Sequence, residues 1–208
     1  MLAAFFVSST LVSRRTSGAL FATDAKGERR DAWQVYANGG PGAVLALLGS
    51  SDVGLRTWLL TASLAAAAAD TWATSLGARS RTPPRLLGFG KTVPPGTSGG
   101  MSLWGSVGGL AGAALVAGAG ALTTGRTLLL PGTLIGFLGM AADSLLGGTV
   151  QGKYWCPSCR QASEWKVHRC GTRTDWKSGW SWLNNDGVNL LATALAGGMA
   201  RVVWHWID

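Results

Sequence analysis

Long apolar stretches separated by basic loops restrict what this 208-residue chain can fold into. Only 13% of its residues are charged, against about 25% in ordinary soluble domains. Six apolar segments have roughly the length of a membrane-spanning helix, near residues 1–12, 35–50, 56–76, 102–122, 127–149 and 187–206. The sequence therefore predicts an all-α fold, a polytopic membrane protein of about six transmembrane helices forming a single membrane domain over residues 1–208.

The first apolar segment is too short to span a membrane alone, because a spanning helix needs about 20 residues. We interpret it as the remnant of a helix that starts upstream of Met1 or as a half-span. A signal peptide is the alternative, but Arg14 and Arg15 follow the apolar run instead of preceding it, and no A-x-A cleavage pattern appears. The 31 glycines lie within apolar stretches, which is typical of closely packed membrane helices.

Basic residues mark one side of the expected bundle. Fifteen of the 18 Lys and Arg residues fall in three long loops, at 13–34, 77–101 and 150–186. The positive-inside rule then places these loops in the cytoplasm and both termini outside. The net charge of +8 is explained mainly by orientation signals and contact with anionic membrane lipids, and the remainder by a phosphorylated substrate. Because no basic helix or aromatic stacking module is present, we expect no nucleic-acid partner.

Two aspartates lie where apolar segments would not be expected to carry charge. The pattern A-A-D-[ST] occurs at Asp70 and again at Asp143, near the cytoplasmic ends of the third and fifth segments. An ionisable residue in a membrane span is costly and is a functional candidate for that reason; the alternative is that each aspartate only caps or pairs helices. The duplication predicts parallel helical-hairpin repeats around one site, to which the glycine-rich stretch 182–198 adds Asp186.

These three carboxylates are expected to face one cavity together with amide side chains. Asp, Asn and hydroxyl oxygens without histidine suit a hard cation, and Mg²⁺ typically binds one or two carboxylates plus substrate phosphates. We therefore predict Asp70, Asp143 and Asp186 as magnesium ligands.

Gly90-Lys91-Thr92 suggests a phosphate-binding loop, but the surrounding sequence does not fit the Walker pattern. Arg85 stands where the first glycine is required, and Pro94-Pro95 follows where a helix should begin. Arg85, Lys91 and the glycine-rich turn at 96–100 still offer cations and backbone N–H groups for phosphate. We predict that Lys91 is a phosphate clamp; the alternative is an orientation charge at the membrane surface.

Five blocks between Lys26 and Asn189 resemble the signature of a known membrane family. They are KGERRDAWQVYANGG, ADTWATSLG, GKTVPPGTSGG, ADSLLGGTVQ and WLNNDGVN. They are similar to blocks of the integral-membrane family that contains the plant phytyl-phosphate kinase and animal transmembrane protein 19. The resemblance implies a magnesium-dependent kinase that transfers a phosphoryl group from a nucleoside triphosphate, such as CTP, to a phytyl or related prenyl monophosphate lipid. For this chain we expect the bacterial inner membrane, with the active site facing the cytoplasm.

Polar residues of these blocks are expected to contact the substrates. They are Arg30, Asp31, Gln34, Asn38, Thr71, Thr74, Arg85, Thr97, Ser98, Gly99, Gly100, Ser144, Gln151, Asn184, Asn185 and Asn189, with Asp70, Lys91, Asp143 and Asp186 as the catalytic set. Two other functions stay open: a cytidylyltransferase that joins CTP to a lipid phosphate, and a transporter or scaffold. The sequence specifies neither prenyl chain length nor oligomeric state.

All three cysteines fall in the last loop, at 150–185. The pattern C-x₂-C followed by H-x-C brings together Cys156, Cys159, His168 and Cys170, which is a ligand set for a closed structural Zn²⁺ site. Free thiols are one alternative, and a disulfide, which the cytoplasm disfavours, is another. A zinc site here would hold the loop over the cavity without taking part in the chemistry.

Overall fold

A computed structural model describes residues 1–16, 32–48, 51–124 and 128–206 of the chain. These residues contain six helices. They are α1 (Leu2–Thr16), α2 (Ala32–Leu48), α3 (Val53–Gly77), α4 (Leu103–Thr124), α5 (Leu129–Thr149) and α6 (Asn185–Trp204). Each apolar segment identified in the sequence coincides with one of these helices, differing at the ends by a few residues.

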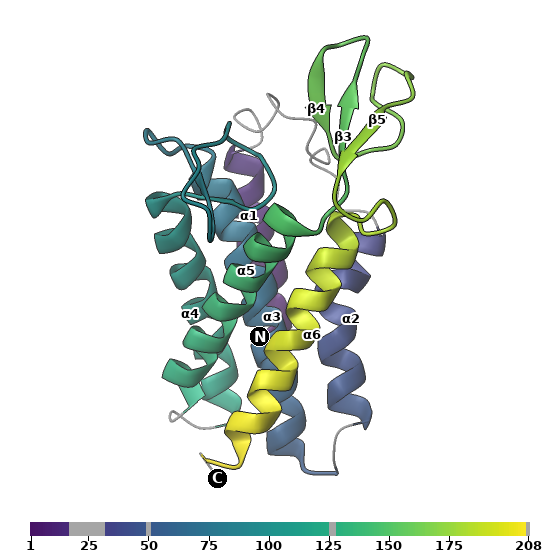
Figure 1. Ribbon diagram of the computed structural model, residues 1–208. Coiled ribbons are helices and arrows are strands. Elements are labelled where there is room, and N and C mark those ends of the chain that lie inside the picture. The colour runs from purple at the N-terminus through teal and green to yellow at the C-terminus, as the bar shows by residue number, and fades with distance from the viewer. Residues whose placement is uncertain (17–31, 49–50, 125–127, 207–208) are drawn as a thin grey trace.

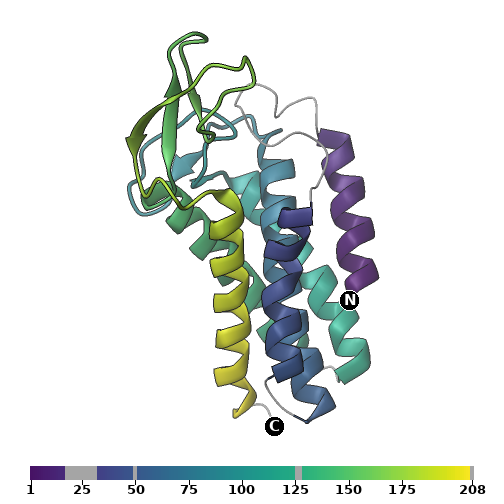
Figure 2. The same cartoon turned by 90° about the vertical axis from the view of Figure 1, so that its right-hand side faces the viewer.

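By length and composition, three of the described helices can cross a membrane: α4 over Leu103–Thr123, α5 and α6. Helices α1 and α2 have only 15 and 17 residues, fewer than the roughly 20 that a full span requires. The structure thus supports six helices and three candidate spans, a smaller number of spans than the sequence predicted. In Figure 2, α1 begins partway along the bundle, as expected for a half-span.

Helix α3 is the centre of the bundle, and the other five helices all pack against it. Its run from Leu64 to Ala69 is buried, and glycines of the neighbouring helices face this run. A Cβ at Gly112 of α4 would lie 2.8 Å from the Ala68 carbonyl oxygen, and one at Gly136 of α5 would lie 2.8 Å from Ala65 Cβ. Small residues on both sides let the backbones approach closely, as the glycine content predicted.

Two loop regions cover the same end of the bundle (Figure 1). In residues 78–102, the short strands β1 (Arg85–Leu86) and β2 (Gly100–Met101) pair in antiparallel fashion. Residues 150–184, called the lobe below, contain a three-stranded sheet in the order β4-β3-β5. Its strands are β3 (Lys153–Cys156), β4 (Gln161–Ser163) and β5 (Asp175–Ser178).

Basic residues concentrate at the loop end. Of the fourteen Lys and Arg residues in the described ranges, twelve lie in or next to the loops at this end, and only Arg56 and Arg201 lie toward the other. The charge asymmetry on which the orientation prediction depends is therefore present in three dimensions.

Candidate functional site

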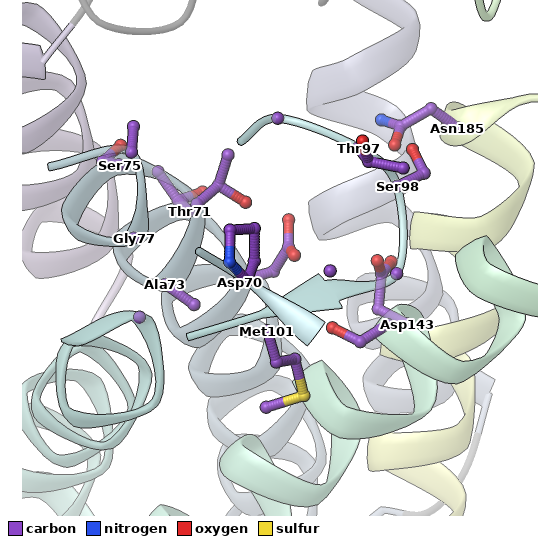
Figure 3. Close-up of a pocket in the computed structure, with 18 of the residues that line it drawn as sticks. Asp70, Thr71, Ala73, Ser75, Gly77, Thr97, Ser98, Met101, Asp143 and Asn185 are labelled. Atoms are coloured by element: carbon purple, nitrogen blue, oxygen red, sulfur yellow. The ribbon is translucent and has the colours of Figure 1, made fainter. Parts of the chain in front are cut away.

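A cavity of about 280 Å³ lies at the loop end of the bundle. The C-terminal parts of α3 and α5, the N-terminal parts of α4 and α6, the turn at 95–102 and one corner of the lobe all line it. Asp70 and Asp143 point into this space from neighbouring helices (Figure 3). The two A-A-D-[ST] patterns, 73 positions apart in the sequence, therefore meet at one cavity.

Most of the predicted site residues line this cavity. They are Gln34, Asn38, Asp70, Thr71, Thr74, Thr97, Ser98, Gly99, Gly100, Asp143, Ser144, Asn184, Asn185, Asp186 and Asn189. Gln151 lies directly behind the lining, where it is 1% exposed and donates from Nε2 to Ser98 Oγ at 3.2 Å. Arg30 and Asp31 lie outside the described residues.

Lys91 and Arg85 are the two predicted phosphate ligands that the structure does not bring to the cavity. Both side chains are exposed, and Arg85 donates to the Gly90 carbonyl oxygen at 3.0 Å. The pairing of β1 with β2, together with the Leu86 N–H to Lys91 carbonyl bond of 2.8 Å, forms a compact turn. Gly88 and Gly90 have φ of +86° and +63°, which favours glycine. This turn accounts for Lys91 facing solvent.

The charge of the cavity is strongly one-sided. Of the six acidic residues in the described ranges, four line the cavity, namely Asp70, Asp143, Glu164 and Asp186, and none of the described basic residues does. Asp70 and Glu164 are close enough for their charges to act on Asp143. Clustered carboxylates repel one another unless protons or cations neutralise them.

One carboxylate oxygen in this group is available to a proton or a cation. Oδ2 of Asp143 is buried and has no hydrogen-bond partner among the described residues, although a buried carboxylate oxygen normally needs one. Thr71 lines the same cavity and its Oγ1 donates to the Ala67 carbonyl at 2.9 Å. These oxygen donors fit Mg²⁺, which prefers carboxylate, hydroxyl and phosphate oxygens.

The N-termini of two helices open onto the same cavity. Ser102 Oγ accepts from the Gly105 N–H at 3.1 Å at the start of α4, and Asn184 Oδ1 accepts from the Gly187 N–H at 3.0 Å at the start of α6. The remaining N–H groups of each first turn and the helix dipoles favour an anion there. The intervening turn packs closely against α5 at Gly99. Only glycine fits there, because a Cβ would lie 2.4 Å from Gly148 Cα and the φ of Gly99 is +84°.

Glu164 and Trp165 of the lobe also line the cavity, and the sequence analysis missed both. The Ser98 hydroxyl donates to Glu164 Oε1, which ties the lobe to the glycine-rich turn. One signal was available: Glu164 is the only acidic residue between Cys159 and His168. The neighbouring Lys153 donates to the Gly148 carbonyl at 2.8 Å. Burial lowers the pKa of Lys153, and the charge of Glu164 partly counters that effect.

The lobe contains a second cluster of potential metal ligands. One ligand atom from each of Cys156, Cys159, His168 and Cys170 lies within 4.8 Å of the others. Cys156 Sγ is 3.7 Å from Cys170 Sγ, which is 3.1 Å from His168 Nδ1, and the three cysteines are not disulfide-bonded. The side-chain amide of Gln161 lies 2.8 Å from His168 Nε2, so Nδ1 is the nitrogen that faces the sulfurs.

This second cluster fits a soft metal ion. Cys₃His is a common zinc ligand set, and zinc binds thiolates. Hydrogen bonds with Thr172 and His168, of which the one with Thr172 has the larger effect, lower the pKa of Cys170 to about 6. Hydrogen bonds with the neighbouring cysteines raise the pKa of Cys159 to about 11. The ligand set predicted from the C-x₂-C and H-x-C spacing is therefore brought together, and it is compatible with Zn²⁺.

Comparison with known proteins places the chain in a membrane family. The family described as integral membrane protein DUF92 matches residues 1–197. The uncharacterized membrane protein MJ0933 of Methanocaldococcus jannaschii is 30% identical, over 95% of this chain and 72% of its own length. Protein PGR of Arabidopsis thaliana is 26% identical, over 100% of this chain and 81% of its own length. No solved structure matches.

Proposed function

This chain belongs to the DUF92 family of integral membrane proteins, and we propose that it is a prenyl-phosphate kinase of that family. The reaction would break the bond between the β–γ bridging oxygen and the γ-phosphorus of a nucleoside triphosphate, such as CTP. A new bond would form between that phosphorus and an oxygen of a phytyl or related prenyl monophosphate. The products are the prenyl diphosphate and the nucleoside diphosphate.

The single observation that carries this proposal is the cavity in which acidic side chains meet two helix N-termini. Asp70, Asp143 and Asp186 would hold Mg²⁺, for which the unpartnered Asp143 oxygen offers a ligand atom. A Mg²⁺ ion held by these residues would supply neutralisation of phosphate charge, which is a main requirement in phosphoryl transfer. Phosphate groups would bind at the starts of α4 and α6, where Ser102 and Asn184 cap the first turns.

The chain's own polar residues would align the two phosphates for transfer. Ser98, Asn185 and Asn189 surround the carboxylates with groups that can donate hydrogen bonds, and amide donors can orient phosphate oxygens without adding charge. Positioning and charge neutralisation are most of what an enzyme supplies to this reaction.

The position of the cavity in the bundle suits an amphiphilic substrate. It lies at the loop end, where a prenyl phosphate would keep its head group at the interface while its tail stays in lipid. Because most described basic residues flank this end, the positive-inside rule supports a cytoplasmic orientation. We therefore propose a multi-pass protein, of the inner membrane if the source is bacterial, whose site faces the cytoplasm.

The test is turnover by the purified protein in detergent or lipid. Phytyl, geranylgeranyl and farnesyl monophosphates are each incubated with each of the four nucleoside triphosphates and Mg²⁺. We expect a prenyl diphosphate and a nucleoside diphosphate for at least one pair, and no product with Asp70→Asn. Release of pyrophosphate with a CDP-linked lipid would instead identify a cytidylyltransferase. Binding without turnover would indicate a transporter or scaffold.

A further inference from the structure

We infer that Glu164 is a cation-binding carboxylate of the cavity and that the Cys/His cluster of the lobe acts as its positioning device. The sequence places the two features side by side, since Glu164 lies between Cys159 and His168. The inference rests on the proposed function for the identity of the substrate, but its core claim concerns only cation binding. The lobe would then contribute a cation ligand to the cavity.

Glu164 reaches the cavity from a different direction than the helical aspartates. Asp70 and Asp143 come from the bundle, whereas Glu164 enters from the lobe and accepts a hydrogen bond from Ser98 on the glycine-rich turn. Its charge acts on Asp143. Glu164 is therefore close enough to share an electrostatic environment with the bundle carboxylates.

Hydrogen bonds restrain the backbone around Glu164. The Trp165 N–H donates to Ser163 Oγ at 3.1 Å, and the Thr174 hydroxyl donates to the Trp165 carbonyl at 2.6 Å. The Thr174 N–H donates to the Lys166 carbonyl at 3.1 Å. Three bonds thus hold the turn that presents Glu164, which limits the rotational freedom of this corner before any ligand binds.

The turn that presents Glu164 is connected to the Cys/His cluster. Strand β4, which leads into Glu164, pairs with β3 so that Gln161 faces Cys156, and the Gln161 amide contacts His168. Both ends of the segment 161–168 are therefore attached to ligands of the cluster. Without a bound metal, this segment would be held by the three-residue strand, the turn bonds, the Val167–Arg173 bridge and the hydrogen bond from Ser98. A metal bound to His168 and Cys156 would add a further constraint at both of its ends.

The charge of the cavity favours a bound cation. The buried Oδ2 of Asp143 has no hydrogen-bond partner among the described residues, and a proton or a cation would satisfy it. With Glu164 the cavity has four carboxylates, and the charge of Lys153 beside Glu164 offsets only part of theirs. Glu164 adds a fourth carboxylate to the three of the bundle, and a bound cation would neutralise the negative charge that remains.

The experiment measures Mn²⁺ binding by electron paramagnetic resonance in the full-length, zinc-loaded protein, so that it does not depend on turnover. We expect Glu164→Gln to weaken Mn²⁺ binding by roughly tenfold. The matched control is Asp175→Asn, because Asp175 is an exposed acid on β5 of the same lobe and does not line the cavity. Unchanged Mn²⁺ binding in Glu164→Gln would overturn the assignment.

The role of the cluster is tested by combining variants. Cys159→Ser, confirmed to have lost its zinc, should weaken Mn²⁺ binding about as much as Glu164→Gln does, and the double variant should be no weaker than either alone. Additive losses would show that the cluster does not act through Glu164.

Because Cys159→Ser could unfold the lobe, Ser98→Ala offers a second variant. It removes a Glu164 contact and leaves all four ligands of the cluster intact. It should weaken Mn²⁺ binding severalfold, and no change would count against the positioning. If the variants alter Mn²⁺ binding as expected but the unmodified protein shows no kinase turnover, the proposed function is rejected and the role of Glu164 in cation binding stands.

Discussion

The oxygen-lined cavity and the Cys/His cluster lie at the same end of the molecule, but they are assembled in opposite ways. The cluster takes its four ligands from residues 156–170 of one loop. The cavity takes its carboxylates from α3, α5, the lobe and α6, between residues 70 and 186. A local ligand set can organise a loop by itself, whereas a distributed set exists only once the bundle has packed.

The two regions also differ in the ions they suit. Carboxylate, hydroxyl and phosphate oxygens favour hard cations such as Mg²⁺, and thiolates with imidazole favour Zn²⁺. Metal binding at each region should therefore respond to different treatments and to different variants. If the cluster only shapes the lobe, its loss should affect the cavity through the lobe residues that line it, Glu164 and Trp165.

The largest effect is expected from the cavity carboxylates. Asp143→Asn keeps the shape of the side chain but removes the charge that would hold Mg²⁺, and turnover should fall by at least about 10² to 10³. The measurement is kcat with a prenyl monophosphate, with circular dichroism to verify helix content. Asp175→Asn, outside the cavity, serves as the control. Near-normal rates in an Asp70→Asn, Asp143→Asn double variant would reject the magnesium assignment.

Removing a cluster ligand should have a smaller and more local effect. Cys159→Ser should eliminate stoichiometric zinc and make the lobe sensitive to proteases, because metal binding energy contributes to folding. The bundle should keep its helix content, since its core lies in α3 and its neighbours. Elemental analysis and mapping of the first proteolytic cuts test this. Three freely titratable thiols in protein purified without a chelator would contradict the zinc assignment.

Thiol chemistry can sharpen the difference between the ligands themselves. In metal-free protein at pH 7, Cys170, whose pKa is about 6, should be mostly thiolate, whereas Cys159, whose pKa is about 11, should be protonated. Because thiolates react with alkylating agents, iodoacetamide should label Cys170 first. Zinc should protect both residues. Mass spectrometry of the labelled peptides would detect the opposite order, which would refute this assignment.

The same pKa shift has a consequence for stability. The pKa of Cys170 is lowered from 9.0 to about 6 in the folded lobe, so its thiolate favours the folded state above pH 9. That contribution decreases as the pH falls and is lost below about 6. In the metal-free protein, the lobe should therefore become more sensitive to proteases as the pH falls from 9 to 6. Cys170→Ser should remove this part of the pH dependence.

The comparison also explains what the sequence could and could not predict. Hydropathy located all six helices, because each apolar run is longer than a turn and is bounded by charge or glycine. The spacing of Cys156 to Cys170 predicted the cluster, since its ligands are local. The repeated A-A-D-[ST] pattern correctly predicted that Asp70 and Asp143 face one cavity.

Features that depend on long-range docking were not predictable in this way. Glu164 reaches the cavity only because the lobe folds over the glycine-rich turn and meets Ser98, and no local pattern records that contact. Lys91 lies in an exposed turn that the Leu86 N–H to Lys91 carbonyl bond and the Arg85–Thr92 bridge close, and these contacts were not evident in the sequence pattern. Six full spans are not confirmed, because α1 and α2 are short and α3, although it has 25 residues, is not among the three candidate spans of the described residues.

The smallest effect is expected at Lys91, where the sequence and the structure lead to different predictions. A lysine that holds phosphate in the transition state would lose about 10² to 10³ in kcat on conversion to Ala. Lys91 is instead exposed and outside the cavity. We therefore expect Lys91→Ala to change kcat by less than about twofold. Any change in KM should disappear at high salt, because exposed charges are screened beyond roughly 10 Å at 0.1 M ionic strength.

Salt and a second substitution decide between the two predictions for Lys91. A residue that only attracts an anionic substrate should be replaceable by Arg, and its effect should depend on ionic strength. A residue that contacts phosphate in a tight turn should tolerate Arg poorly, because a planar fork replaces a compact ammonium group. If Lys91→Ala and Lys91→Arg both lower kcat at high salt, the turn at 86–91 must close over the cavity during catalysis. If neither does, the starts of α4 and α6 hold the phosphates without it.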